Sequence, residues 1–196
     1  NESTPKPLLV VGAGIAGVTA ALEAAEAGHE VVLVEREPTV GGRVLRSHQY
    51  FPKLCPPSCG MEINIRRLER NPRVRVMTAT RITKAERNGG GWKVTLTQAP
   101  MYVNERCTAC GECSKVCTSK VDDPFNLGMQ QVSAIRLPHQ DAWPNRYVLD
   151  KDACSSSDLK AITEACQYDA IDLEAAAKDV VLGVSAVVLA TGWKPY

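Results

Sequence analysis

The sequence has no excess of charge of either sign. It contains 23 basic and 22 acidic residues, which give a formal net charge of +1. Proteins that bind nucleic acid or an anionic membrane surface electrostatically carry clusters or an excess of basic residues. We therefore expect no nucleic-acid partner and no direct electrostatic binding to a membrane.

Long apolar runs are also missing. The longest, such as Leu8–Val11 and Val184–Ala190, are far shorter than the roughly 20 residues that a membrane-spanning helix needs. No secretory signal peptide is visible. The chain starts with Asn1 instead of Met, so we expect a trimmed start and a poorly ordered lead-in over Asn1–Pro7.

Histidine is scarce, whereas cysteine is abundant. The three histidines, His29, His48 and His139, are scattered, and each is expected to have a surface or packing role. Eight cysteines suit either a disulfide framework or metal ligation. A disulfide framework is typical of small secreted chains with little core. This chain is 44% hydrophobic, so we expect a folded core. Because an apolar α/β pattern precedes most of the cysteines and their spacing is typical of metal ligands, we expect reduced thiols in a cytoplasmic setting.

The first part of the chain predicts one βαβ unit. Leu8–Val11 and Val31–Val34 are apolar runs of strand length, and Val18–Ala27 has helical spacing that ends before Gly28. Further elements expected downstream are a short helix over Glu62–Glu69, strands over Val74–Met77 and Trp92–Thr97, and a hairpin turn over 88–91.

A glycine-rich turn joins the first strand to the helix. Gly12, Gly14 and Gly17 fit the pattern G-x-G-x-x-G, and Glu35 ends the second strand. The first glycine permits a tight turn, the second lets a pyrophosphate approach the backbone, and the third lets helix and strand pack closely. The acid stands where a ribose hydroxyl is bound. The pattern therefore predicts a dinucleotide site; the alternative is a glycine-rich turn without a ligand.

A second glycine pair follows the acid. Gly41-Gly42-Arg43 lies a few residues beyond Glu35, and Ala190-Thr191-Gly192 lies near the end of the sequence. This order resembles the extended fingerprint of flavoproteins with two dinucleotide-binding domains. The resemblance implies FAD instead of a nicotinamide cofactor, although Gly41-Gly42 is also compatible with an ordinary turn. The residues expected to bind FAD are Gly12, Gly14, Ile15, Ala16, Gly17, Glu35, Arg36, Gly42, Arg43, Thr191 and Gly192.

Four cysteines are packed into one short run. Cys107, Cys110, Cys113 and Cys117 match C-x2-C-x2-C-x3-C, the spacing of bacterial ferredoxins. Zinc sites more often use two separated pairs, so structural zinc is the second choice. In two-cluster ferredoxins the fourth cysteine of each run binds the other cluster, so Cys113 needs a remote partner.

The second half of this ferredoxin-like repeat is degenerate. Cys166 ends it, but the same spacing counted backwards reaches Ile162 and Leu159, which cannot bind iron. We therefore favour one 4Fe–4S cluster held by Cys107, Cys110, Cys113 and Cys166. With one cluster, Cys117 and Cys154 are expected to be buried free thiols. The alternative is two clusters, in which Cys117 and Cys154 are second-choice ligands.

Cys55 and Cys59 form a separate pair around Pro56-Pro57. Because proline disrupts a helix interior, we expect a stiff, non-helical loop here. The pair is either a redox disulfide facing the flavin or two small residues in that loop, and we favour the second.

The motifs divide the chain into three segments. We predict a Rossmann-like α/β domain over 1–99, an inserted ferredoxin-like α+β iron–sulfur domain over 100–175, and a return strand of the first domain over 176–196. The composition changes after Pro100, and Met101–Leu173 holds six of the eight cysteines.

Together these residues resemble the HdrA family, named for the A subunit of heterodisulfide reductase, over nearly the whole chain. Within it, His48–Pro57, Gly60–Asn64 and Ala190–Tyr196 look like QmoA-type flavoproteins of quinone-interacting membrane-bound oxidoreductase complexes. Such proteins usually continue well beyond the Ala190-Thr191-Gly192 segment, so part of the usual flavoprotein is expected to be absent. Thr118 also replaces the proline that normally follows the cysteine run.

The resemblance implies an oxidoreductase subunit that relays electrons between a membrane quinone pool and cytoplasmic adenylylsulfate reductase through FAD and iron–sulfur clusters. It implies partner subunits that hold the chain at the membrane, and leaves a homodimer open. One alternative is an HdrA-like subunit of a sulfur-oxidising or heterodisulfide-reducing complex, with a thiol or disulfide carrier as partner. Another is a docking subunit that transfers electrons without a substrate of its own.

Overall fold

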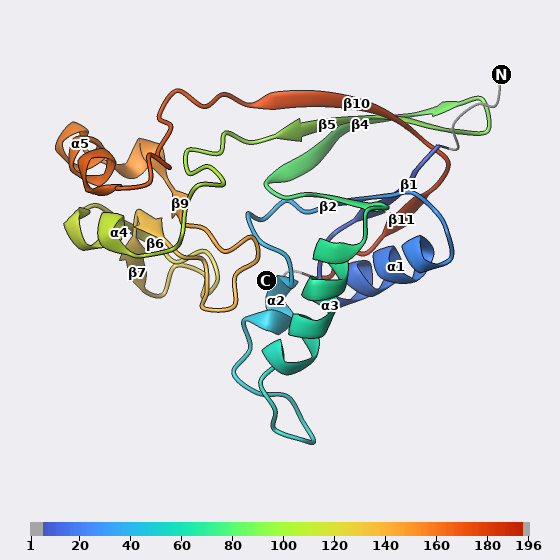
Figure 1. The fold of residues 1–196 in the computed structure, drawn as a ribbon, viewed down its shortest axis with the longest axis horizontal. Helices are drawn as coiled ribbons and strands as arrows, with labels where there is room; N and C mark the ends of the chain where they lie inside the picture. Colours follow the sequence, from blue (N-terminus) through green and yellow to red (C-terminus); the bar gives the residue numbers. More distant parts are fainter. Residues whose placement is uncertain (1–5, 194–196) are drawn as a thin grey trace. The chain divides into compact units, whose positions relative to one another are not determined.

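The computed structural model describes residues 6–193 (Figure 1). The chain forms two compact units, Asn1–Ala99 with Ala177–Tyr196, and Pro100–Ala176. Two expected segments lie partly outside the described residues. They are residues 1–5 of the N-terminal lead-in and residues 194–196 of the QmoA-like segment. No helix in the described part has the length and apolar character that a membrane span needs.

A parallel sheet forms the centre of the first unit. Its strand order is β11-β1-β2-β3, and every pairing is parallel. All four residues of β2 are buried, as expected for strands covered on both faces. Burying each such Val or Leu stabilises the fold by about 1.5–3 kcal/mol. The strands are β1 (Leu8–Val11), β2 (Val31–Val34), β3 (Val74–Met77) and β11 (Val187–Leu189).

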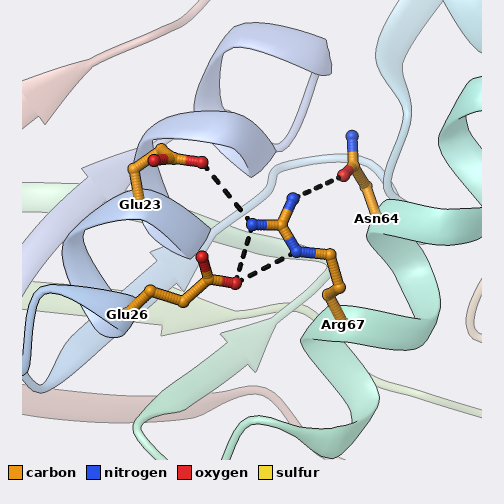
Figure 2. A network of polar contacts seen from close by, with 4 residues as sticks. All are labelled: Glu23, Glu26, Asn64 and Arg67. Atoms are coloured by element: carbon orange, nitrogen blue, oxygen red, sulfur yellow. Dashed lines mark hydrogen bonds and ion pairs between the residues drawn. The ribbon is translucent and has the colours of Figure 1, made fainter.

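Helices α1 (Ile15–Glu26) and α3 (Ser58–Arg70) are joined by one arginine (Figure 2). Arg67 donates to the carboxylate of Glu26 at 2.7 and 3.0 Å, and to that of Glu23 at 3.5 Å. It also donates to the amide oxygen of Asn64 at 3.1 Å. The network links α3 to α1 at the surface, where solvent screening keeps its contribution to stability small.

The start of α3 corrects one expectation. The helix was predicted over Glu62–Glu69, and the Cys55–Cys59 segment was predicted to be non-helical. Instead, α3 begins at Ser58 and contains Cys59. Pro57 is its N-cap, where a missing N–H costs nothing because the first helical N–H groups have no intrahelical partner.

A second, antiparallel sheet completes the first unit, with strand order β10-β5-β4. The predicted turn at 88–91 connects β4 to β5, and β4 itself was missed. Most of β4 is exposed, and its exposed side chains are mostly polar or charged, so it lacks the apolar run that indicates a buried strand. Val94, Leu96 and Val184 pack into one core with residues of the parallel sheet. The strands are β4 (Thr80–Asn88), β5 (Gly91–Gln98) and β10 (Lys178–Val184).

The second unit has short elements around a small core. Two helices, α4 (Glu112–Val116) and α5 (Ser156–Ala165), accompany a 3-10 turn η1 (Lys151–Ala153). The core contains Val103, Ile135 and Ile162, and five of the six cysteines of this unit contribute to it or pack against it. The strands pair as β6 (Lys120–Asp122) with β7 (Gln131–Ser133), and β8 (Ile135–Arg136) with β9 (Val148–Leu149).

Candidate functional site

The glycine loop of the first unit is tightly packed at two of its three glycines. Gly12 has φ +97°, and a Cβ there would overlap the carbonyl oxygen of Ala190. A Cβ on Gly17 would overlap the carbonyl oxygen of Gly12. The first glycine thus allows the turn and the return of the chain from β11, while the third brings helix and loop together.

Gly14 differs from the other two. It is the N-cap of α1, with φ −70° and ψ −177°, and no side chain caps the helix there. A Cβ on Gly14 would meet nothing within 4 Å. No side chain caps the N–H groups at the start of this 12-residue helix, and together with the helix dipole these groups suit an anion such as a pyrophosphate.

The second glycine pair lies directly against this loop. The Gly41 N–H donates to the Ala13 carbonyl at 2.7 Å, and Gly41 forms a parallel bridge with Gly14. Both Gly41 and Gly42 have positive φ, +102° and +59°. A Cβ on Gly42 would lie 3.2 Å from the Gly14 Cα. The pair is thus a part of the same site and not an isolated turn.

The side chain of Glu35, the acid that follows β2, points toward the glycine loop. Glu35 is 7% exposed, and its carboxylate accepts from the backbone N–H of Ala13 at 2.7 Å and of Glu37 at 2.9 Å. On the other side of β1, Ala190 donates to the Val11 carbonyl at 2.8 Å. Strand β11 therefore brings Thr191 beside the glycine loop.

Other expected FAD contacts lie nearer the surface. Ile15 and Ala16 open helix α1 and are exposed, and Arg36 is also exposed and pairs with Glu37 at 3.3 Å. The guanidinium of Arg43 lies 5.3 Å from the centre of the Trp193 ring. Trp193 was not among the predicted site residues, although its place next to Gly192 is a signal for it.

Four thiols line one pocket in the second unit. They are those of Cys107, Cys110, Cys113 and Cys166, and the remaining lining includes Val103, Tyr147 and Ile171. Burial first, and then the other three thiols, raise the pKa of the Cys113 thiol to about 11. The structure therefore brings together the same four cysteines that the ferredoxin spacing predicts as ligands of one cluster.

Backbone geometry supports this pocket. Gly111 is the N-cap of α4, with φ +87°, and a Cβ there would lie 3.3 Å from the Tyr147 hydroxyl oxygen. The N–H of Ala109 donates to the Cys107 sulfur, and that of Ala170 to the Cys166 sulfur, both at 3.4 Å. Such N–H···S bonds tune iron–sulfur clusters.

Within residues 6–193, no three histidine, cysteine or acidic side chains converge closely enough to hold one metal ion. A cubane has a different requirement, because its four thiolates bind four different irons and surround the cluster. Four thiols around an otherwise largely apolar pocket fit that donor set.

Cys117 and Cys154 lie outside this pocket. The carboxylate of Asp158 accepts from the backbone N–H groups of Thr118 at 3.1 Å and Ser119 at 2.8 Å. Asp158 was missed by the sequence reasoning, although its place three residues after Ser155, which caps α5, is a capping signal.

All eight cysteines are free thiols. The backbone of Cys55 forms an isolated antiparallel β-bridge with that of Tyr50, and Cys59 is exposed in the first turn of α3. The structure thus gives Cys55 and Cys59 no disulfide, and their role stays a prediction.

The fold of the first unit and its glycine loop are those of a Rossmann-like dinucleotide-binding domain. Residues 10–80 match the family described as an NAD(P)-binding Rossmann-like domain. Among solved structures, an L-proline dehydrogenase from P. horikoshii aligns with 98% of this chain and 43% of its own, at 14% identity and a TM-score of 0.46.

Nearly the whole chain is homologous to the A subunits of heterodisulfide reductases. It is 35% identical to the A subunit of the ferredoxin:CoB-CoM heterodisulfide reductase of Methanosarcina acetivorans, over 96% of this chain and 24% of that protein. It is 33% identical to the iron–sulfur A subunit of the CoB–CoM heterodisulfide reductase of Methanocaldococcus jannaschii, over 97% of this chain and 29% of that protein. The chain therefore spans about a quarter of the length of these relatives.

Proposed function

We propose that the chain is the FAD- and iron–sulfur-binding part of an electron-transferring oxidoreductase subunit of the heterodisulfide reductase type. The observation that carries the proposal is the pocket lined by the thiols of Cys107, Cys110, Cys113 and Cys166. The names of the relatives support it, since they describe the A subunits of heterodisulfide reductases, one of them as an iron–sulfur subunit.

In this proposal the first unit binds FAD at the glycine loop. The α1 N-terminus at Gly14 binds the pyrophosphate, and Glu35 accepts from the ribose hydroxyls. Gly42 lets the cofactor approach the loop closely, while Thr191 and Gly192 contact it from the return strand. Bound FAD supplies two-electron chemistry, so these residues position the cofactor and do no acid–base chemistry on a small substrate.

The second unit holds one 4Fe–4S cluster. Cys107, Cys110 and Cys113 supply three thiolates from one loop, and Cys166 supplies the fourth from the end of α5. A cluster held by these four cysteines would supply one-electron chemistry, so the chain would couple a two-electron to a one-electron carrier. The apolar walls and the N–H groups of Ala109 and Ala170 set its reduction potential.

The identity of the complex is a finer proposal. We favour a QmoA-type complex, in which partner subunits hold the chain at the cytoplasmic side of a membrane. There it passes electrons between quinone and adenylylsulfate reductase. The sequence of His48–Pro57 and Gly60–Asn64 supports this choice. The names of the relatives favour the alternative, an HdrA-like subunit that works with a thiol or disulfide carrier.

Two experiments test the proposal. Anaerobic visible and EPR spectra of the purified chain, with flavin and iron counts, should give one FAD and about four irons. A chain that reconstitutes neither group would refute the proposal. Co-purification then separates the complexes: quinone-linked membrane subunits favour the QmoA type, and thiol-carrier partners the HdrA type.

A further inference from the structure

Cys117 and Cys154 are brought together from distant parts of the second unit. Cys117 is the residue that follows α4, and Cys154 follows the 3-10 turn η1. Both are half-buried and pack against the core around Ile162. The Cys117 thiol donates to the Ser119 carbonyl at 3.6 Å, and Cys117 lies near enough to Cys154 to raise the pKa of the Cys154 thiol.

Hydrogen bonds between their neighbours hold the two cysteines in place. The carboxylate of Asp158 accepts from both the backbone N–H and the hydroxyl of Thr118 and of Ser119. The N–H of Ser155 donates to the Ser119 hydroxyl at 3.3 Å. The residues that follow Cys117 are therefore fastened to the residues that follow Cys154, independently of the thiols themselves.

This pair lacks the further thiols that a cluster needs. Leu159 and Ile162 stand at the positions where a ferredoxin repeat would supply two more cysteines. Ile162 is fully buried, and Leu159 packs against the same core. The other four cysteines of this unit line a separate pocket. Two adjacent thiols with apolar neighbours are suited to forming a bond with each other.

We propose that Cys117 and Cys154 are a redox-active dithiol that closes to a disulfide by exchange with a small disulfide. One thiolate attacks the small disulfide, forms a mixed disulfide and releases the first small thiol. The second cysteine then attacks the protein sulfur of that mixed disulfide and releases the second small thiol. The protein loses two electrons and two protons, and the small disulfide gains both.

The environment of Cys154 determines the rate of this thiol–disulfide exchange. Burial first, and then the neighbouring Cys117 thiol, raise the pKa of Cys154 to about 11. The attacking species is the thiolate, so exchange at neutral pH should be slow. The contact between Ser155 and Ser119 keeps the two cysteines close, and closure requires their sulfurs to come within a bond length of about 2.05 Å.

The test uses the purified, cluster-loaded full chain under anaerobic conditions, with glutathione disulfide as the probe. Mass spectrometry of its peptides should show a Cys117–Cys154 disulfide that dithiothreitol reverses, with iron content unchanged. Cys117→Ser and Cys154→Ser should each abolish that linked peptide. The Cys55→Ser, Cys59→Ser double variant is the matched control and should retain it.

Three results would overturn the proposal. One is that glutathione stays attached to either cysteine without closure. Another is that glutathione disulfide leaves both thiols free in protein whose circular dichroism is native. The third is that Cys117→Ser or Cys154→Ser lowers the metal content, because the pair would then be a ligand site. None of these results depends on whether FAD binds.

Discussion

Replacing Gly14 with valine separates cofactor binding from folding. Gly14 has an extended backbone conformation that any residue adopts, with φ −70° and ψ −177°. A Cβ there would meet nothing within 4 Å. We therefore expect Gly14→Val to fold, with the free energy of unfolding lowered by about 1 kcal/mol because valine is a poorer N-cap residue than glycine.

The same substitution should weaken FAD binding. The branched side chain would occupy the space through which the pyrophosphate approaches the α1 N-terminus. Losing one hydrogen bond to a charged phosphate costs about 1.5–3 kcal/mol, or roughly a 10- to 150-fold higher Kd. Titration of the flavin-free chain with FAD, followed by flavin fluorescence, measures the change.

Gly60→Ala is a matched control for this prediction. Gly60 lies inside α3, and a Cβ there would also meet nothing within 4 Å. Alanine should stabilise the helix by about 0.5–1 kcal/mol and leave FAD affinity unchanged. Full flavin occupancy with wild-type affinity in Gly14→Val would refute the assignment of the glycine loop.

Two further predictions concern the cysteines and the acid. The Cys55→Ser, Cys59→Ser double variant should keep both FAD and cluster; loss of about four irons on analysis would instead reveal a second cluster. Hydrogen bonds from Ser119 and Thr118 lower the pKa of Asp158 to about 2. Asp158 should therefore stabilise the fold above its unfolded pKa of about 3.9 and lose this effect as the pH falls through about 2. Thermal unfolding of Asp158→Asn and wild type should differ most above that range and converge below it; a difference independent of pH would contradict the prediction.

The parallel sheet was predictable because its signals are local. Buried strands such as Val31–Val34 are continuous apolar runs, and the Rossmann-like α/β prediction is confirmed by the family match over residues 10–80. Strand β4 was missed because its exposed side chains are mostly polar or charged. What makes it a strand is its antiparallel pairing with β5 across the hairpin turn, which its own side chains do not signal as an apolar run.

The candidate sites depend more on tertiary structure. The spacing of Cys107, Cys110 and Cys113 pointed to a remote partner, and the structure puts Cys166 at their pocket. The hydrogen bonds that the Asp158 carboxylate accepts from Thr118 and Ser119 were not predictable, because these partners lie some 40 residues away in the sequence. The ferredoxin-like character of the second unit and the cofactor ligands stay predictions.

The measurement that tests the central claim most directly compares two single variants by iron content and EPR. If the cluster binds the remote cysteine, Cys166→Ala should lose it or degrade it to a three-iron form. Cys117→Ala should leave both iron content and EPR signal nearly unchanged. The opposite pattern, with Cys117 essential and Cys166 without effect, would mean that the run from Cys107 to Cys117 holds its cluster alone.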